Sequence, residues 1–188
     1  MKIKRIFDLI LGMLLLMLLI SPMLVIGVLV LLTSNGPSIY WSDRVGKENL
    51  IFKMPKFRSM LIETPDVASH LLRNPDRYLT SIGGFLRSSS LDELPQLFSI
   101  LKGDMSFVGP RPALFNQEDL IASRTEKGVS QLLPGITGWA QINGRDHLSI
   151  KDKVRLDEEY LYRKSFWFDL SILYKTVKRV IGSKGISH

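Results

Sequence analysis

The sequence predicts a mostly α-helical protein with a small β-hairpin and a membrane segment at its N-terminus. An apolar run fills residues 6–32, two short β-prone stretches follow at residues 38–41 and 50–53, and helical patterns bounded by glycine and proline fill much of the remainder. The 188 residues have room for one ordinary domain beside one membrane segment. We expect these two units at residues 1–36 and 37–188.

The apolar run contains Asp8 as its only charged residue. A straight helix of this length would measure roughly 40 Å, enough to cross a hydrocarbon core of about 30 Å with tilt. A cleaved signal peptide does not fit, because the run is too long and no small-x-small cleavage site precedes Ser34. We therefore expect a membrane helix.

Ser21 and Pro22 lie near the middle of this run, where proline removes a backbone hydrogen bond and kinks or breaks a helix. Basic residues flank the run on both sides, and positive residues favour the cytoplasmic side of a membrane. Two interpretations fit these residues equally well, a kinked spanning helix and a hairpin that enters and leaves on one side. The flanking basic residues are Lys2, Lys4, Arg5, Arg44, Lys47, Lys53, Lys56 and Arg58.

The β-prone stretches 38–41 and 50–53 are joined by turn-forming residues at 46–49, which predicts a hairpin. Loops are expected at residues 81–84 and 134–138, which are rich in glycine. Residues 108–112 cannot form a regular helix, because Pro110 and Pro112 flank Arg111 and fix a rigid turn.

Helices are predicted for residues 66–74, 94–101, 116–127, 152–164 and about 166–181. The last of these carries aromatic residues beside basic ones, a composition that suits a helix on a membrane surface. An ordinary amphipathic helix that packs on the core fits the pattern equally well. The residues concerned are Trp167, Phe168, Tyr174, Lys175, Lys178 and Arg179.

The formal net charge of +7 indicates an acidic partner or surface. Three classes fit this charge: nucleic acid, anionic lipid and a phosphorylated small molecule. We expect no nucleic-acid partner, because no helix-turn-helix, zinc-finger or RNP pattern occurs. The absence of cysteine excludes disulfides and Cys-ligated zinc, and the histidines at 70, 147 and 188 are too scattered to predict a metal site.

The stretch from Ser90 to Pro95 is the most informative for chemistry. Ser90 followed by Glu93 fits a helix capping box, and acidic residues suit a helix N-terminus. The same residues fit a catalytic site, because adjacent carboxylates in a helical turn diverge by about 100°. One carboxylate could then face a phosphorus centre, where carboxylate nucleophiles are established, while the other faces a metal or an incoming hydroxyl.

Chemistry on a diphosphate needs cations, and arginine and lysine are the side chains that bind phosphate oxygens. Arg111 is the strongest candidate, because its two neighbouring prolines set its direction at low entropic cost. Each of the others alone is more often a solvated surface charge. The candidate phosphate-binding residues are Lys56, Arg58, Arg87, Arg111 and Arg145.

Together these motifs make the chain resemble the monotopic phosphoglycosyl transferases, also called bacterial sugar transferases, which initiate glycan assembly on undecaprenyl phosphate. The matching segments occur in family order and span nearly the whole chain. They are KRIFD at residues 4–8, SP at 21–22, KFRSM at 56–60, LR at 86–87, SLDELPQL at 90–97, LKGDMSFVGPRP at 101–112 and PGITGWAQINGR at 134–145.

The resemblance implies a reaction. Asp92 would attack the β-phosphorus of a UDP-sugar, expel UMP and hold the phosphosugar as an ester, which undecaprenyl phosphate then accepts. Glu93 would assist as a base or at a metal site. The resemblance also implies Mg²⁺, with Asp92 and Asp157 as metal-site carboxylates. It supports phosphate-binding or site-ordering roles for the basic residues Lys56, Arg87, Arg111 and Arg145.

The resemblance also implies a location. Residues 1–36 would form a re-entrant helix-break-helix with Ser21 and Pro22 at the break, and residues 37–188 a catalytic domain at the cytoplasmic face of the bacterial inner membrane, with interfacial amphipathic helices. Membrane lipids would be partners, and a homodimer is compatible with the sequence. The alternatives are a membrane-bound, Mg²⁺-dependent phosphodiesterase and a non-catalytic lipid-binding scaffold. The sequence does not identify the sugar.

Overall fold

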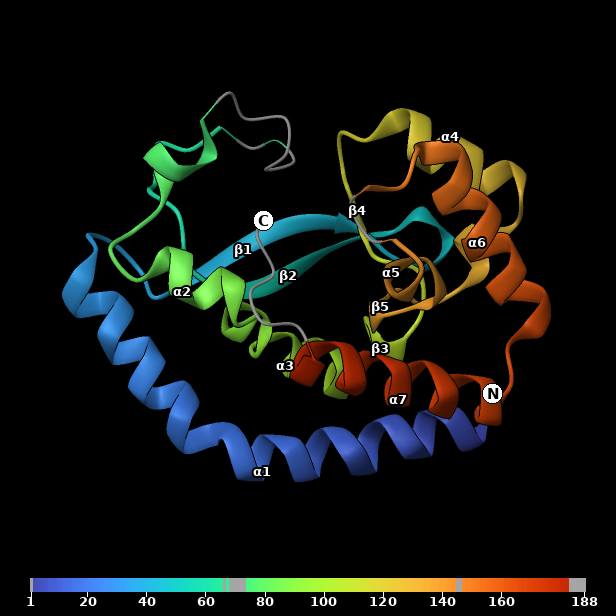
Figure 1. Cartoon of the computed structure of the whole chain (residues 1–188), viewed down its shortest axis with the longest axis horizontal. Coiled ribbons are helices and arrows are strands. Elements are labelled where there is room, and N and C mark those ends of the chain that lie inside the picture. Colours follow the sequence, from blue (N-terminus) through green and yellow to red (C-terminus); the bar gives the residue numbers. More distant parts are fainter. Residues whose placement is uncertain (1, 66, 68–73, 145–146, 183–188) are drawn as a thin grey trace.

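The computed structural model describes residues 2–65, 67, 74–144 and 147–182, and these form a mostly helical protein with two small sheets (Figure 1). The helices are α1 (Lys2–Thr33), α2 (Gly83–Ser88), α3 (Gln96–Lys102), α4 (Glu118–Glu126), α5 (Trp139–Ile142), α6 (Ile150–Arg163) and α7 (Phe166–Gly182). The strands are β1 (Ile39–Val45), β2 (Ile51–Phe57), β3 (Ser106–Val108), β4 (Ala113–Leu114) and β5 (Gly135–Thr137). The predicted fold class is thus confirmed in its mostly helical character and its small sheet.

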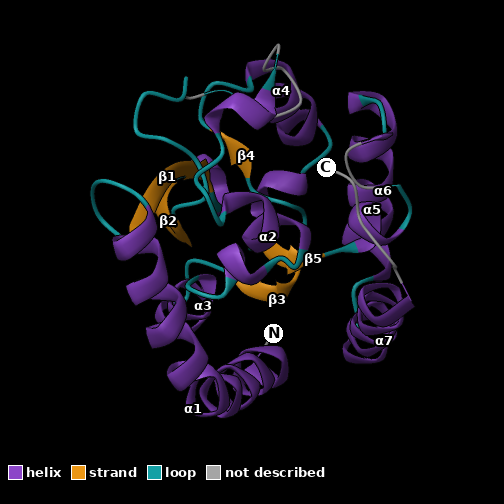
Figure 2. Ribbon diagram, turned by 60° about the vertical axis from the view of Figure 1, so that its left-hand side comes forward, coloured by secondary structure: helices purple, strands orange, loops and turns teal. Residues whose placement is uncertain are grey.

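The apolar N-terminal run forms one long helix, α1, which is the one candidate membrane span by length and composition among the described residues. The sequence predicted a break or kink at Ser21 and Pro22. The helix continues through both residues, and its axis bends near its middle (Figures 1 and 2). A bend is expected there, because Pro22 lacks an N–H and its ring crowds the preceding turn.

Only a narrow face of α1 is buried against the rest of the protein, and most of its large apolar side chains are exposed. Gly12 lies against α3, where an added Cβ would come within 3.1 Å of the Leu101 side chain. Met23, Ile26 and Val30 pack in a core cluster with Phe57 and Leu86. The helix therefore lies along the folded domain and leaves an apolar outer face.

The predicted hairpin is confirmed and is longer than predicted. Strands β1 and β2 pair antiparallel from Ile39 opposite Phe57 to Val45 opposite Ile51. Strand β4 pairs with the other edge of β1, so the order in the sheet is β2-β1-β4. Strand β2 contains Pro55, which suits this edge position because proline cannot donate a ladder hydrogen bond.

The prediction of a loop at residues 134–138 is wrong for its central part, because β5 pairs there with β3 in parallel. The two strands meet at glycines. A Cβ on Gly135 would lie 2.1 Å from the Gly109 nitrogen, so only glycine permits this approach of the two backbones. The predicted loop at residues 81–84 also overlaps the first residues of α2.

The main core joins β2, β3, α3, α6 and α7. Its buried members are Met54, Leu97, Ile100, Met105, Phe107, Val108, Tyr160 and Ile172. Four predicted helices, at 94–101, 116–127, 152–164 and 166–181, correspond to α3, α4, α6 and α7. The predicted helix at 66–74 lies largely outside the described residues.

Candidate active site

The two predicted catalytic carboxylates lie on a single 3₁₀ turn, Leu91–Glu93, between α2 and α3. Ser90 precedes the turn in the left-handed conformation, with φ of 57°, and its side chain makes no capping hydrogen bond. The capping-box interpretation is therefore wrong. The acidic residues instead lie in a short turn held between two helices, with Asp92 buried.

Lys56 connects the hairpin to this turn. Its Nζ donates a hydrogen bond to Glu93 Oε1 at 2.7 Å and lies 3.6 Å from Asp92 Oδ2. The side chains of Lys56, Glu93 and Asp92 are 16%, 13% and 9% exposed, so water screens these charges only weakly. The hairpin thus places the Lys56 ammonium beside both carboxylates.

Two arginines complete the cluster. Arg111 Nη2 lies 3.4 Å from Glu93 Oε1, and the Arg111 side chain is 35% exposed. Arg87 extends from α2, where its Nη1 lies 3.1 Å from the Met60 sulfur, and its charge acts on Asp92. The structure therefore gathers Lys56, Arg87 and Arg111 around the two carboxylates, as a phosphate-binding site requires.

The electrostatics of Asp92 differ from those of an ordinary aspartate. Burial raises the pKa of Asp92, and the charge of Glu93 adds to the rise, while Lys56, Arg87 and Arg111 oppose it. Among the described residues, the closest cation to the Asp92 carboxylate is Lys56 at 3.6 Å, beyond hydrogen-bonding distance. Asp92 therefore keeps a desolvated and incompletely satisfied oxygen, which suits a nucleophile.

Arg58 lies elsewhere, although the sequence grouped it with the phosphate-binding residues. Its guanidinium is buried at the end of α1, where Nη2 donates to the Ser34 carbonyl at 3.2 Å and the Gly36 carbonyl at 2.9 Å. The last turn of α1 contains no basic residue, so Arg58 supplies the positive charge that a helix C-terminus favours. Arg145, the fifth predicted phosphate ligand, lies outside the described residues.

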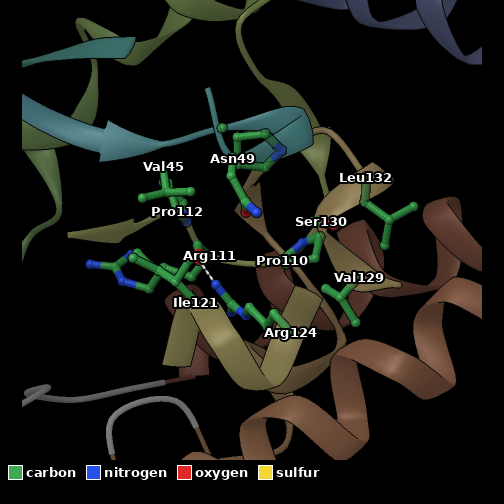
Figure 3. Close-up of a pocket in the computed structure, with 13 residues that line it drawn as sticks. Val45, Asn49, Pro110, Arg111, Pro112, Ile121, Arg124, Val129, Ser130 and Leu132 are labelled. Atoms are coloured by element: carbon green, nitrogen blue, oxygen red, sulfur yellow. Dashed lines mark hydrogen bonds between the residues drawn. The ribbon is translucent and has the colours of Figure 1, made fainter. Parts of the chain in front are cut away.

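Asp157 was predicted as a metal-site carboxylate, and the structure gives it a different partner. It is 1% exposed and accepts hydrogen bonds from Arg124 Nε at 3.0 Å and Nη2 at 2.6 Å. Arg124 Nη1 in turn donates to the Arg111 carbonyl at 2.8 Å (Figure 3). Asp157 therefore helps to fix the Arg111 backbone, because it orients the Arg124 side chain that donates to the Arg111 carbonyl.

The sequence analysis did not identify Arg124, which lies within the helix predicted at residues 116–127. A signal was present in α6. Asp157 falls three residues after Val154 and three before Tyr160, on the buried face of the helix. A carboxylate in that position requires a cationic partner, because a buried charge is costly unless it is paired.

Magnesium fits this site only in part. Among the residues that the structure describes, no group of three or more acidic, histidine or cysteine side chains converges on a common point. Mg²⁺ is commonly held by one or two carboxylates together with substrate phosphates and water. Asp92 and Glu93 match that donor set, whereas an all-protein cage is not formed by the described residues.

A small pocket with about 30 Å³ of room for water lies behind Arg111 and opens into solvent (Figure 3). Its walls come from the end of the hairpin, the turn at residues 110–113, α4 and residues 129–134, with Asn49, Ile121 and Ser130 among the lining residues. Arg111 lines this pocket, and its guanidinium reaches Glu93. One residue thus borders both the pocket and the carboxylates.

The chain is similar to known proteins along nearly its whole length. Residues 1–183 match the profile of the family described as bacterial sugar transferase. The chain is 42% identical to an uncharacterised sugar transferase of Bacillus subtilis (strain 168) over 188 residues, which cover 99% of this chain and 91% of that protein.

Two longer relatives carry more specific names. UDP-glucose:undecaprenyl-phosphate glucose-1-phosphate transferase of Escherichia coli (strain K12) is 42% identical over 93% of this chain and 39% of its own length. Undecaprenyl-phosphate glucose phosphotransferase of Komagataeibacter xylinus is 40% identical over 96% of this chain and 36% of its own length. The chain thus spans less than half the length of these two proteins. Since the matches cover almost all of its residues, the chain belongs to the bacterial sugar transferase family.

Proposed function

We propose that the protein transfers a sugar 1-phosphate from a UDP-sugar to undecaprenyl phosphate, with Asp92 as the nucleophile. The observation that carries this proposal is the buried Asp92–Glu93 pair surrounded by Lys56, Arg87 and Arg111. The names of the relatives support the same donor and acceptor, since they specify undecaprenyl phosphate with glucose or galactose.

In the first step, an Asp92 carboxylate oxygen forms a bond to the β-phosphorus of the UDP-sugar. The bond between that phosphorus and the oxygen bridging to the α-phosphorus breaks, and UMP leaves with the electron pair. In the second step, a phosphate oxygen of undecaprenyl phosphate attacks the phosphosugar ester. The Asp92–phosphorus bond breaks and the carboxylate is restored.

The cations stabilise charge as it moves onto the phosphate oxygens. Lys56 and Arg111 contact Glu93 in the free protein, and their donors fit a diphosphate equally well. Glu93 therefore holds both cations beside Asp92 before the donor binds, in addition to its predicted role as a base or metal-site residue. Asp92 and Glu93 would hold a bound Mg²⁺, which would supply further neutralisation of phosphate charge.

We also propose that α1 is re-entrant, with both ends at the cytoplasmic face of the inner membrane and with residues 37–188 as the catalytic domain. Both ends of the helix support this, because both are bonded to the same folded domain. Arg5 donates to the Ile100 carbonyl at 2.6 Å near one end, and Arg58 donates to Ser34 and Gly36 at the other. A spanning helix would separate its ends by the thickness of the bilayer.

Helix α7 is proposed to lie in the membrane interface. Its exposed side chains include Trp167 and Tyr174 together with Lys175 and Lys178, a combination suited to lipid headgroups. The prenyl chain of the acceptor stays in the bilayer, so a site held at headgroup depth can meet its phosphate.

The reaction is tested by UMP release from purified full-length protein with UDP-sugars, MgCl₂ and undecaprenyl phosphate. The donor panel should include UDP-glucose, UDP-galactose and UDP-N-acetylated hexosamines. We expect the wild type to release UMP and to place sugar phosphate on the lipid, and Asp92→Asn to do neither. Asp119→Asn is the matched control, because Asp119 is exposed on α4.

The outcomes separate the alternatives. Intact-protein mass spectrometry without acceptor should show a phosphosugar adduct on the wild type and none on Asp92→Asn. Hydrolysis of the donor without transfer to lipid would indicate the phosphodiesterase. A protein that binds lipid vesicles but turns over no donor would indicate the scaffold.

Topology is tested by single cysteines, since the native chain has none. Lys2→Cys and Ser38→Cys mark the two ends of α1. A membrane-impermeant maleimide should label neither in intact spheroplasts and both after lysis. Labelling of one end alone in intact spheroplasts would establish a spanning helix instead.

A further inference from the structure

The turn that carries Arg111 is held by hydrogen bonds from three separate elements. The Val108 carbonyl lies 3.0 Å from Lys4 Nζ, the Pro110 carbonyl accepts from the Gly135 N–H at 2.9 Å, and the Arg111 carbonyl accepts from Arg124 at 2.8 Å. Arg111 lies at the end of this series and reaches Glu93. These contacts fix the backbone that carries the Arg111 side chain.

The donor to the Val108 carbonyl is Lys4. Tyr160 Oη also lies 3.3 Å from this carbonyl, but it is only 2.7 Å from Asp169 Oδ1. Burial, together with Asp169, raises the pKa of Tyr160, so the hydroxyl keeps its single proton and donates it to the closer acceptor. The ammonium of Lys4 is left as the group that holds Val108, and a charged donor makes the stronger hydrogen bond.

Lys4 belongs to the first turns of α1, and the same helix contacts β3 at three successive residues. Asp8 accepts from Ser106 Oγ at 2.8 Å and from the Phe107 N–H at 3.3 Å, and Lys4 contacts Val108. Lys4 is also paired with Asp169 of α7. Figure 1 shows the N-terminal part of α1 running beside the start of α7.

We propose that Lys4 is a positioning residue for the transfer reaction, because its ammonium, supplied by the membrane helix, fixes the turn that directs Arg111 at the donor phosphates. The proposal rests on the proposed transferase function. If Lys4 has this role, catalysis requires α1 to be packed against the folded domain, because the site is complete only with this contact formed.

The first test compares Lys4→Met with Lys2→Met in the full chain. Both substitutions remove one positive charge from the same end of α1, but Lys2 is exposed. We expect Lys4→Met to lower kcat between about tenfold and a hundredfold with little change in KM, because misalignment costs transition-state stabilisation. Lys2→Met should match the wild type. Equal kcat for the two variants would overturn the proposal.

The second test separates positioning from stability. Lys4→Met leaves Asp169 without its cation, so a lower unfolding temperature is expected for this variant. The double variant Lys4→Met with Asp169→Asn removes that unpaired charge. Its unfolding temperature should recover while kcat stays low, because Val108 still lacks its charged donor. Recovery of kcat together with stability would show that the contact is only structural.

The third test asks whether Lys4 acts through Arg111. In an Arg111→Ala background, Lys4→Met should reduce kcat by less than about twofold, since coupled residues are not additive. A full additional loss would contradict the proposal. If the wild type transfers no sugar phosphate, the proposed function fails; if it transfers normally and Lys4→Met does too, only this inference fails.

Discussion

Two buried carboxylates in this protein, Asp92 and Asp157, have opposite surroundings. Asp157 is 1% exposed and accepts two hydrogen bonds from one guanidinium, at 2.6 and 3.0 Å. The Asp92 side chain is 9% exposed, and its nearest cation, Lys56, lies 3.6 Å away and bonds instead to Glu93. Both carboxylates are withdrawn from water, and burial raises the pKa of each; Asp157 is hydrogen-bonded to its cation, whereas Asp92 is not.

This difference distinguishes a carboxylate that stabilises the structure from one that is available for reaction. A carboxylate whose lone pairs are engaged by a fixed arginine cannot readily bond to another atom. A carboxylate that is desolvated and incompletely paired remains reactive, but it lowers the stability of the folded protein. Asp157 accordingly holds Arg124 in place, and Arg124 holds the Arg111 carbonyl. Asp92 instead lies beside the cations that would bind a phosphorylated donor. The predictions below test that contrast.

Asp157 is expected to show the largest effect on stability. Asp157→Asn leaves Arg124 buried without a counterion and should lower the free energy of unfolding by about 3–5 kcal/mol. Chemical denaturation of the detergent-solubilised protein measures this. Replacing both partners, Asp157→Leu with Arg124→Met, should recover much of the stability but not the transferase activity. A stable and fully active Asp157→Asn would contradict the supporting role.

Arg58 should show a smaller effect. Arg58→Met removes the charged donor that caps α1 and should cost about 2 kcal/mol of unfolding free energy. Its KM for the UDP-sugar should stay near the wild-type value, because Arg58 is bonded to Ser34 and Gly36. Lys56→Met provides the contrast and should weaken donor binding. A raised KM for Arg58→Met would restore the sequence-based prediction that Arg58 binds phosphate.

The pH dependence of kcat/KM should report Asp92. Its pKa is raised above the ordinary 3.8, and the proposed mechanism requires its ionised form. As pH falls below the raised pKa, kcat/KM should fall about tenfold per pH unit. The midpoint of this fall should lie at a higher pH than for an ordinary aspartate. Stopped assays between pH 4 and 8 measure this. A midpoint at or below pH 3.8 would contradict the desolvated environment of Asp92.

The smallest expected effect is the stability of Asp92→Asn. Burial raises the pKa of both Asp92 and Asp157, but Asp92 has no hydrogen-bonded cation among the described residues that its substitution would leave unpaired. A raised pKa means that the folded state binds more protons than the unfolded state between 3.8 and the raised value. The free energy of unfolding then falls as pH rises through that window. At neutral pH, Asp92→Asn should therefore be at least as stable as the wild type in thermal denaturation. A clear loss of stability would show that Asp92 is a structural group.

Local sequence patterns predicted the hairpin, four of the helices and the gathering of Lys56, Arg87 and Arg111. They failed where a long-range contact decides the structure. Strand β5 has a glycine-rich sequence typical of a loop, and it becomes a strand only because Gly109 lies against it from a distant segment. Pairing of this kind leaves no periodic signal.

The two site residues whose contacts differ from prediction, Arg58 and Asp157, show the same limit. Residue type suggested Arg58 as a phosphate ligand, and the family resemblance implied Asp157 as a site carboxylate. They did not indicate that Arg58 would turn back to the end of α1, or that Asp157 would meet Arg124 from another helix. Which cation meets which carboxylate depends on packing between elements, and the sequence alone does not encode it in a local pattern.

Three glycines around the Arg111 turn also limit how this protein can diversify. An added methyl group at Gly109, Gly135 or Gly138 would lie 2.2 Å or less from a backbone atom, against Leu133 oxygen, Gly109 nitrogen and Gly109 oxygen respectively. No rotamer change relieves a collision with main chain. A side chain at any of the three positions would therefore force the main chain at this junction to move, so sequence change that keeps the junction intact is confined to other positions.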